Sequence, residues 1–308
     1  MTGPSEYRWI EANPAAVAAA LATAGIAVDV DKISVLERDE RFAAALPGDR
    51  LAWFPRNEAG LARLARETRV LRLLKQNCDF RVPIVEYEAA AGWQVRSAVP
   101  GQSDPVATYQ RAVSDPRFAA RMGKVIGRML ASQHAIAADG LTGWLPTTPS
   151  WPPPRAEMER DLEQVVEDRS LIGRALALIE RYADGMGQTA KRVLIHCDLG
   201  FHNMVVDRTG NVVGIFDYDD AAFADPHIDF RYLLLDGSDE VLFDAATTAD
   251  RNEGGAAIDL ARVRLLNAAS AVGFLALRAG HEPDSRPAGR TLEEDLRWTR
   301  LALARADG

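Results

Sequence analysis

The chain has 308 residues, of which 47% are hydrophobic and 26% are charged, as in an ordinary globular protein with material for a large core. Its net charge of −8 is unlike that of a general nucleic-acid binder, so we exclude nucleic acid as its partner. The two cysteines, Cys78 and Cys197, lie far apart and form no CxxC pair, which favours a reducing, cytoplasmic setting. The length suits two lobes that share a cleft.

The first helix of the chain is predicted by its end signals. Asn13-Pro14 supplies an N-cap and a proline for the first helical position, and Gly25 supplies a stop. The alanine-rich stretch between them, residues 15–24, is too short to cross a membrane. It also lacks the flanking residues of a signal peptide, so we expect neither a leader nor a membrane partner.

The next segment predicts a small β-rich lobe with one prominent helix. Strand-like patches occur at Ile33–Leu36 and Leu51–Phe54, and again on both sides of the turn Ala91-Gly92. Between them, residues 58–76 carry apolar side chains at helical spacing. Glu67 lies on that apolar stripe, and a carboxylate on a buried face needs a cation or hydrogen-bond donors.

After Pro100-Gly101 the pattern becomes mainly helical, and we place a lobe boundary there. The prediction is an α+β protein with residues 1–100 as a β-rich N-terminal lobe and residues 101–308 as a larger helical C-terminal lobe. Helical periods cover residues 116–138, 156–169, 171–184, 226–235, 257–279 and 291–305. A cleft between two such lobes is a usual place for a small-molecule site.

The residues that carry chemistry gather in one stretch of the second lobe. An apolar run, Val193–Ile195, leads into Asp198, and Asn203 follows with four residues between them. A later apolar run ends at Asp217. Phosphoryl transfer needs a base near the acceptor hydroxyl and a divalent metal on the phosphates. Because carboxylate and amide oxygens suit magnesium, these three side chains predict a phosphoryl-transfer centre.

The same stretch resembles the aminoglycoside phosphotransferase-like family of small-molecule kinases, whose fold is related to that of protein kinases. The family's loop reads H-G-D-x-x-x-x-N, and its later strand ends in I-D-F or a variant, followed by D-P-x-x-D. Here the matching residues are His196, Asp198 and Asn203, then Phe216-Asp217-Tyr218, then Asp225-Pro226-His227-Ile228-Asp229. The resemblance implies that Asp198 is the catalytic base and that Asn203 and Asp217 bind magnesium. It also implies that His196 and Asp229 support the loop.

A weaker likeness extends over residues 30–235. The segment that begins at Glu67 is similar to a small-lobe helix whose glutamate pairs with a basic residue on a neighbouring strand. Residues 95–101 resemble the hinge whose backbone binds adenine, which implies that Ser97 and Val99 supply those groups. By this resemblance the protein uses ATP or GTP with Mg²⁺ to phosphorylate a hydroxyl of a small molecule, such as an aminoglycoside or another antibiotic.

The nucleotide half departs from the family's pattern in two places. The region Leu36–Leu46, where a phosphate-binding loop is expected, contains no glycine. Trp53 stands where the family has lysine or arginine. Arg50 or Arg56 is therefore our candidate for the cation that serves Glu67 and the phosphates.

Several of these residues also have a plainer interpretation. Asp198 and Asn203 are of types common in turns, and Asp225-Pro226 is also a helix start. We interpret His202 as a loop histidine and His227 as a surface histidine. The combination and spacing of Asp198, Asn203 and Asp217, rather than any single residue, favour the phosphoryl-transfer centre.

A cluster of nine carboxylates between Asp217 and Asp244 is accompanied by one basic residue, Arg231. Magnesium accounts for one or two of the nine. The others either attract a cationic, amine-bearing acceptor or form a solvated acidic face.

Three other functions fit parts of the sequence. The missing lysine and glycines fit a non-catalytic, pseudokinase-like binding protein. A kinase of a small metabolite, such as an amino alcohol or a sugar, would have the same motif. The third is a metallohydrolase, which leaves Asn203 and Glu67 without a role. Its ligands would come from His196, Asp198, His202, Asp217 and His227.

Overall fold

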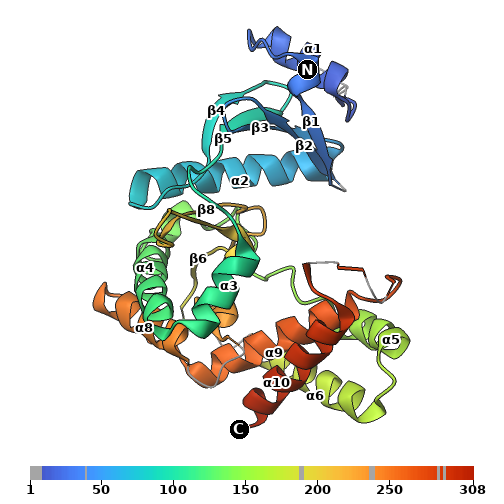
Figure 1. Cartoon of the computed structure of the whole chain (residues 1–308), viewed down its shortest axis with the longest axis vertical. Helices are drawn as coiled ribbons and strands as arrows, with labels where there is room; N and C mark the ends of the chain where they lie inside the picture. Colours follow the sequence, from blue (N-terminus) through green and yellow to red (C-terminus); the bar gives the residue numbers. More distant parts are fainter. Residues whose placement is uncertain (1–8, 39, 187–190, 236–239, 283–284, 287–288) are drawn as a thin grey trace. The chain divides into compact units, whose positions relative to one another are not determined.

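The computed structural model describes residues 9–308 except 39, 187–190, 236–239, 283–284 and 287–288 (Figure 1). The chain forms two compact units, each with its own apolar core. One comprises Met1–Ser103 with Asn203–Asp219, and the other comprises Asp104–His202 with Asp220–Gly308. The expected division of the chain into an N-terminal lobe, residues 1–100, and a C-terminal lobe, residues 101–308, stays a prediction.

The first unit is built on an antiparallel sheet with the strand order β1-β2-β3-β5-β4. The strands are β1 (Ser34–Glu37), β2 (Arg41–Leu46), β3 (Arg50–Pro55), β4 (Ile84–Glu88) and β5 (Gln94–Ser97). Four of them lie where the sequence predicts strands. The sequence does not predict β2, because its alanines at 43–45 have weak strand propensity. Pairing with β1 on one side and β3 on the other makes it a strand all the same.

Different helices cover the two faces of this sheet (Figure 1). The helices are α1 (Pro14–Thr23) and α2 (Glu58–Asn77). Phe42 and Phe54 point to one face and pack with Leu21 of α1 in an apolar cluster. Side chains on the other face meet α2, where the Thr68 hydroxyl donates to the side-chain oxygen of Gln94 at 2.7 Å. The predicted end signals of α1 are confirmed, since the Asn13 side chain caps its N-terminus.

A hairpin of β7 (Met204–Val206) and β8 (Val212–Ile215) completes the first unit. The segment that follows β5 is bonded to it, because the backbones of Gln102 and Val206 exchange hydrogen bonds of 2.9 and 2.8 Å. A Cβ atom at Gly101 would lie 2.7 Å from the Val206 carbonyl oxygen, so a glycine permits this close approach. These contacts fix the hairpin to the segment that follows β5.

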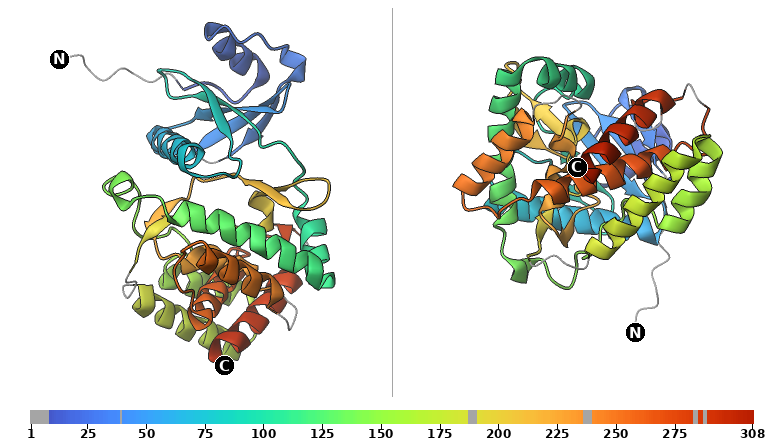
Figure 2. Two further views of the ribbon diagram at one scale, coloured as in Figure 1. Left: turned by 90° about the vertical axis from the view of Figure 1, so that its left-hand side faces the viewer. Right: turned by 90° about the horizontal axis from the view of Figure 1, so that it is seen from below.

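The second unit is mainly helical. Its helices are α3 (Pro105–Ser114), α4 (Pro116–His134), α5 (Arg155–Val165), α6 (Arg169–Met186), α7 (His227–Phe230), α8 (Val241–Asn252), α9 (Leu260–Ala276) and α10 (Leu292–Asp307). A two-stranded sheet pairs β6 (Val193–Ile195) with β9 (Ala222–Ala224). Helices α9 and α10 lie side by side and share an apolar core with α5 and α6 (Figure 2). The sequence predicts these helices except α3 and α8.

No helix among the described residues combines the length and the apolar character that crossing a bilayer requires. The long helix α4 instead packs closely on α8 through two glycines. A Cβ atom at Gly123 would lie 2.4 Å from the Leu242 carbonyl oxygen, and one at Gly127 would lie 2.1 Å from that of Ala246. Real Cβ atoms do not approach a backbone oxygen so closely, so the two helices must separate if either glycine gains a side chain.

Gly127→Ala should therefore destabilise the protein, by about 1–3 kcal/mol, because the added methyl group forces two packed helices apart. The matched control is Gly173→Ala on α6, where a Cβ atom meets nothing within 4 Å. That change should stabilise by roughly 0.5–1 kcal/mol, because alanine is the better helix former. Urea unfolding of both variants measures the difference, and equal gains in stability would contradict the close-packing account.

Candidate functional site

Asp229 on α7 holds the loop that follows β6. This carboxylate is fully buried and accepts the backbone N–H groups of His196 and Cys197 at 3.0 and 3.1 Å. It also accepts the side-chain amide of Gln133 at 3.0 Å and lies 3.1 Å from Nε2 of His134. The buried charge is thus surrounded by donors, which is the condition for keeping it in a core. These contacts agree with the supporting role that the resemblance implied for Asp229.

Cys197 takes up a backbone conformation that favours glycine. Its φ of 74° lies in the left-handed region. Its N–H donates to Asp229, and its carbonyl oxygen accepts from the Arg231 guanidinium, so both sides of the residue are anchored. Burial raises the pKa of the Cys197 thiol far above its usual range, so the thiol stays protonated and is not a nucleophile.

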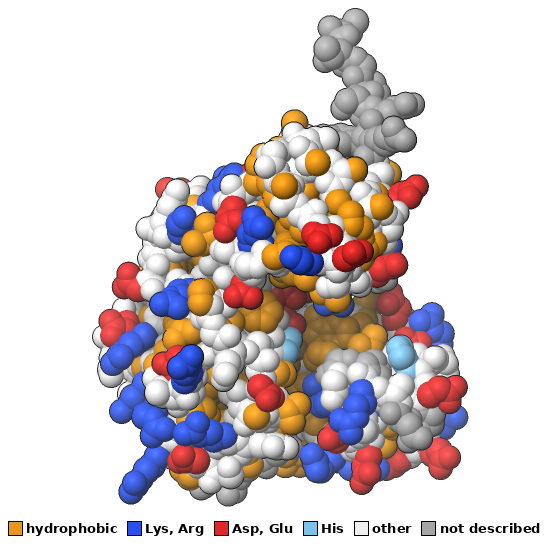
Figure 3. Space-filling model, turned by 45° about the horizontal axis from the view of Figure 1, so that its top comes forward, with side chains coloured by type: hydrophobic (Ala, Val, Ile, Leu, Met, Phe, Trp, Pro, Cys, Tyr) orange, Lys and Arg blue, Asp and Glu red, His pale blue; other side chains and the backbone are white. Residues whose placement is uncertain are grey.

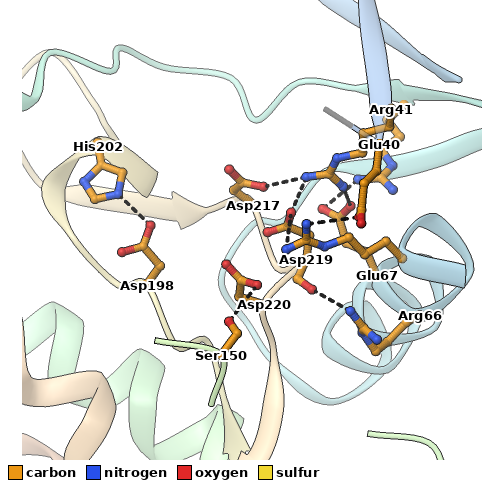
Figure 4. Close-up of polar contacts among 12 residues, drawn as sticks. Glu40, Arg41, Arg66, Glu67, Ser150, Asp198, His202, Asp217, Asp219 and Asp220 are labelled. Carbon is orange, nitrogen blue, oxygen red and sulfur yellow. Dashed lines mark hydrogen bonds and ion pairs between the residues drawn. The ribbon is translucent and has the colours of Figure 1, made fainter. Parts of the chain in front are cut away.

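Asp198, the expected base, pairs with His202. Its Oδ2 lies 2.9 Å from Nε2 of His202 (Figure 4), while its N–H donates to Nδ1 of His196 at 3.2 Å. Burial favours a higher pKa for Asp198, but the hydrogen bond and charge of His202, with His196 and Arg231, lower it below its ordinary value. The carboxylate is therefore ionised at neutral pH, as a base must be.

The structure changes the sequence-based interpretation of His202 and adds a contact for His196. His202 is not merely a loop residue, because it is the partner of the expected base. The sequence signal for this pairing was that His202 lies four residues after Asp198 in the same short loop. His196, expected to support the loop, accepts the N–H of Asp198 through its Nδ1. That contact fixes the turn between His196 and Asp198.

Asn203 and Asp217 come from the same end of one hairpin. Asn203 directly precedes β7, and its carbonyl oxygen accepts the N–H of Phe216 at 3.0 Å, one residue before Asp217. Asp217 has a φ of 66° and a side chain that is 43% exposed. An amide oxygen and an accessible carboxylate are hard oxygen donors that fit Mg²⁺, which commonly takes one or two protein ligands and completes its shell with water and phosphate oxygens.

Glu67 of α2 is the centre of a buried charge network in the first unit (Figure 4). Its Oε1 lies 2.7 Å from Nη1 of Arg96 on β5, and its Oε2 lies 3.3 Å from Nη1 of Arg41 on β2. The N–H of Tyr218 also donates to it. Burial favours a higher pKa for Glu67, but Arg96 first and Arg41 second outweigh it, so the pKa is lowered.

Arg41 extends this network to the expected metal ligand. Its second terminal nitrogen, Nη2, lies 3.6 Å from Oδ1 of Asp217 and forms an ion pair with Asp219. Arg66 donates to the carbonyl oxygen of Asp219 at 3.3 Å. One guanidinium therefore joins α2 to the turn that carries Asp217.

The expectation that Arg50 or Arg56 pairs with Glu67 is wrong. Arg50 begins β3 and donates to the Pro47 carbonyl oxygen, and Arg56 pairs with Glu37 at 2.6 Å on the exposed edge. Strand alternation explains this, because Arg50 lies on the same face of β3 as Phe54, which packs toward α1, and Arg56 follows the last residue of the strand. Since the sequence did not predict β2, its first residue was not considered as the source of the cation.

The expected adenine-binding segment follows β5. Ser97 is still part of the sheet, opposite Arg50 and Ile84, and its hydroxyl accepts the N–H of Ile84 at 3.3 Å. Val99 lies beyond the strand and is buried. Within the part of the chain that the structure describes, the backbone of Val99 has no hydrogen-bond partner. Val99 thus fits the hinge role better than Ser97 does.

Most carboxylates of the acidic cluster have partners inside the protein. Asp225 pairs with Arg262 and with His227 at 2.6 Å, which also shows that His227 is not a surface histidine. Glu240 pairs with Arg264 at 2.9 Å. Asp236 and Asp239 lie outside the described residues. Figure 3 likewise shows acidic and basic side chains interspersed on the face that it displays, so the cluster is a weak argument for a cationic acceptor.

No group of three or more histidine, cysteine or carboxylate side chains that could hold a metal occurs among the described residues. The ligands expected of a metallohydrolase have other partners. His196 bonds its own loop, and His227 binds Asp225 through Nδ1 and accepts the N–H of Asp259 through Nε2. The geometry gives no support to that alternative.

Comparison with known proteins agrees with the site. A sequence profile for a phosphotransferase enzyme family matches residues 48–266, more than half of the chain. The chain belongs to this phosphotransferase enzyme family. The matched range includes Glu67, Asp198, Asn203 and Asp217 but not β2. A search of curated proteins gave no significant match.

Solved structures of phosphotransferases share the fold. The GDP complex of wild-type aminoglycoside 2'-phosphotransferase-IIIa matches with a TM-score of 0.67 and 20% identity over 94% of this chain and 97% of that one. Macrolide 2'-phosphotransferase MphH from Brachybacterium faecium matches with 0.60 and 20% over 95% and 98%. A streptomycin–ATP–APH(2")-IIa complex matches with 0.57 and 16% over 90% and 92%. The expected protein-kinase-like α+β fold of this phosphotransferase is confirmed.

Glu67→Gln should destabilise the protein by about 3–5 kcal/mol, because it leaves Arg41 and Arg96 buried without their common countercharge. The folded-state pKa of Glu67 is lowered, so its contribution is complete above its ordinary value of about 4.5 and is lost as the pH falls through the lowered folded value. Urea unfolding at neutral and acidic pH should show the difference between wild type and variant shrinking below about pH 4.5.

The matched control is Glu88→Gln, which removes a largely exposed partner of Arg72. It should change the free energy of unfolding by no more than about 1 kcal/mol. A Glu67→Gln effect as small as this control's, or one that does not depend on pH, would show that the buried network does not stabilise the first unit.

Proposed function

We propose that this phosphotransferase moves the γ-phosphate of ATP or GTP to a hydroxyl of a small molecule. The observation that carries the proposal is the ionised Asp198, separated by four residues from an asparagine that shares a hairpin end with Asp217. In this proposal Asp198 orients the acceptor hydroxyl and takes its proton. Asn203 and Asp217 hold Mg²⁺, which would neutralise charge on the phosphates.

The nucleotide is proposed to bind the first unit. The backbone of Val99, which has no hydrogen-bond partner among the described residues, supports adenine or guanine binding after β5, with Ser97 as the other expected hinge residue. Glu67 is held by two arginines, so the missing lysine does not leave the site without a cation. This observation favours an active enzyme over a pseudokinase-like binding protein.

The proposed acceptor is an aminoglycoside or another antibiotic. Two of the fold relatives are an aminoglycoside and a macrolide phosphotransferase, which supports this class. The alternative is a kinase of an amino alcohol or a sugar, and a screen of acceptors distinguishes it from an antibiotic kinase. We propose that the enzyme works in the cytoplasm, in keeping with its two free thiols.

Asp198→Ala should lower turnover about 10²–10⁴-fold, because the acceptor hydroxyl loses its base. Nucleotide affinity, measured by calorimetry, should stay close to that of the wild type. The control is Asp139→Ala, which removes an exposed carboxylate far along the chain from the loop. Turnover of Asp198→Ala near the wild-type rate, in a screen of antibiotics, amino alcohols and sugars, would exclude Asp198 as the base.

His202→Gln should move the acidic limb of the kcat/KM profile to higher pH. His202 helps to lower the pKa of Asp198, so its loss raises that pKa and the base becomes protonated at a higher pH. The control is His281→Gln at an exposed site, which should leave the limb unchanged. A limb that stays in place, or moves to lower pH, in His202→Gln would mean that another group sets the profile.

A further inference from the structure

We propose that Arg41 on β2 replaces the cation missing from β3 and binds the nucleotide phosphates beside Asp217. This inference rests on the proposed function. It concerns a strand that precedes the residues matched by the family profile. The phosphate-binding cation has thus moved to a neighbouring strand rather than been lost.

The sheet register places the relevant side chains on one face. Trp53 of β3 lies opposite Ala43 of β2 and Gln94 of β5; Arg41 lies two residues before Ala43, and Arg96 lies two residues after Gln94. Residues two apart on a strand point to the same side. The guanidinium carbons of Arg41 and Arg96 lie 4.6 and 5.8 Å from the centre of the Trp53 ring. The Trp53 ring therefore lies against two guanidinium groups, whereas a lysine at this position of β3 would supply a single cation.

Arg96 and Arg41 have different roles in this network. Arg96 is 4% exposed and makes the shorter contact with Glu67, 2.7 Å, so it can compensate that carboxylate by itself. Arg41 makes the longer contact with Glu67, and its other end is directed at Asp217 and Asp219 (Figure 4). Arg41 is thus the cation that can turn toward a ligand without leaving Glu67 uncompensated.

Asp219 would also keep partners if Arg41 turned. Nη2 of Arg63 lies 3.7 Å from its carboxylate, and Arg66 donates to its carbonyl oxygen. Asp217 is different, because Mg²⁺ bound there would cancel the negative charge that now attracts Arg41. A phosphate oxygen on that Mg²⁺ is then the natural new partner for Arg41, since a guanidinium fork matches phosphate geometry.

The test compares wild type, Arg41→Gln and the control Arg56→Gln, whose arginine pairs with Glu37 on the exposed edge. Calorimetry measures the affinity for Mg·ATP and Mg·GTP and for adenosine and guanosine. Arg41→Gln should bind the preferred triphosphate about 10- to 100-fold more weakly, as expected for losing a charged hydrogen bond, with the nucleoside unaffected. Arg56→Gln should bind like wild type. Adding Trp53→Lys to Arg41→Gln returns a cation to β3 and should recover most of the loss.

Triphosphate affinity of Arg41→Gln within about twofold of wild type would overturn the inference, and so would equal losses for triphosphate and nucleoside. If Arg41→Gln does not fold, Arg41→Lys carries the same comparison, because it keeps the charge and loses the fork. Wild-type protein that binds neither triphosphate would instead refute the proposed function. The two failures are therefore distinguishable.

Discussion

The buried carboxylate of Glu67 is the constraint on which the first unit depends. A charge that is 3% exposed must be compensated, and here β2, β5 and the backbone of Tyr218 all contribute to it. The requirement joins helix α2 to the sheet and both to the turn that carries Asp217. A conformation that separates them loses contacts of a buried charge, so the turn that carries Asp217 is held by the same interactions that stabilise the first unit.

Two residues expected in catalysis lie in or beside backbone that ordinarily favours glycine. Asp217 has a φ of 66°, and Cys197, next to Asp198, has a φ of 74°. Each is anchored within its own unit, Asp217 by the Arg41 network and Cys197 by Asp229 and Arg231. Such conformations persist where surrounding contacts determine them and are common at functional sites. The anchoring contacts are thus as much a part of the candidate site as the proposed ligands and the proposed base.

The residues proposed as base and metal ligands could be selected from the sequence because they lie close together along the chain. Asp198 follows the apolar run Val193–Ile195, Asn203 precedes the next run and Asp217 ends a third, all at short spacings, and Asn13 likewise signals the start of α1. The nucleotide half was not predictable in the same way. Arg41 reaches Glu67 across 26 residues of sequence, and only strand pairing brings the two together. Because of its alanines, β2 was not predicted as a strand. The cation for Glu67 was therefore sought at the ends of the next strand, and Arg50 and Arg56 were selected wrongly.

We propose that this protein binds the nucleotide phosphates through a cation on β2 while Glu67 stays paired with Arg96. A crystal structure of the complex with Mg²⁺ and a non-hydrolysable triphosphate tests it most directly. We expect the Arg41 guanidinium within about 3.2 Å of a phosphate oxygen and an Asp217 oxygen at about 2.1 Å from the metal. Phosphates held by Arg50 or Arg56, with Arg41 still on Asp219, would contradict the account.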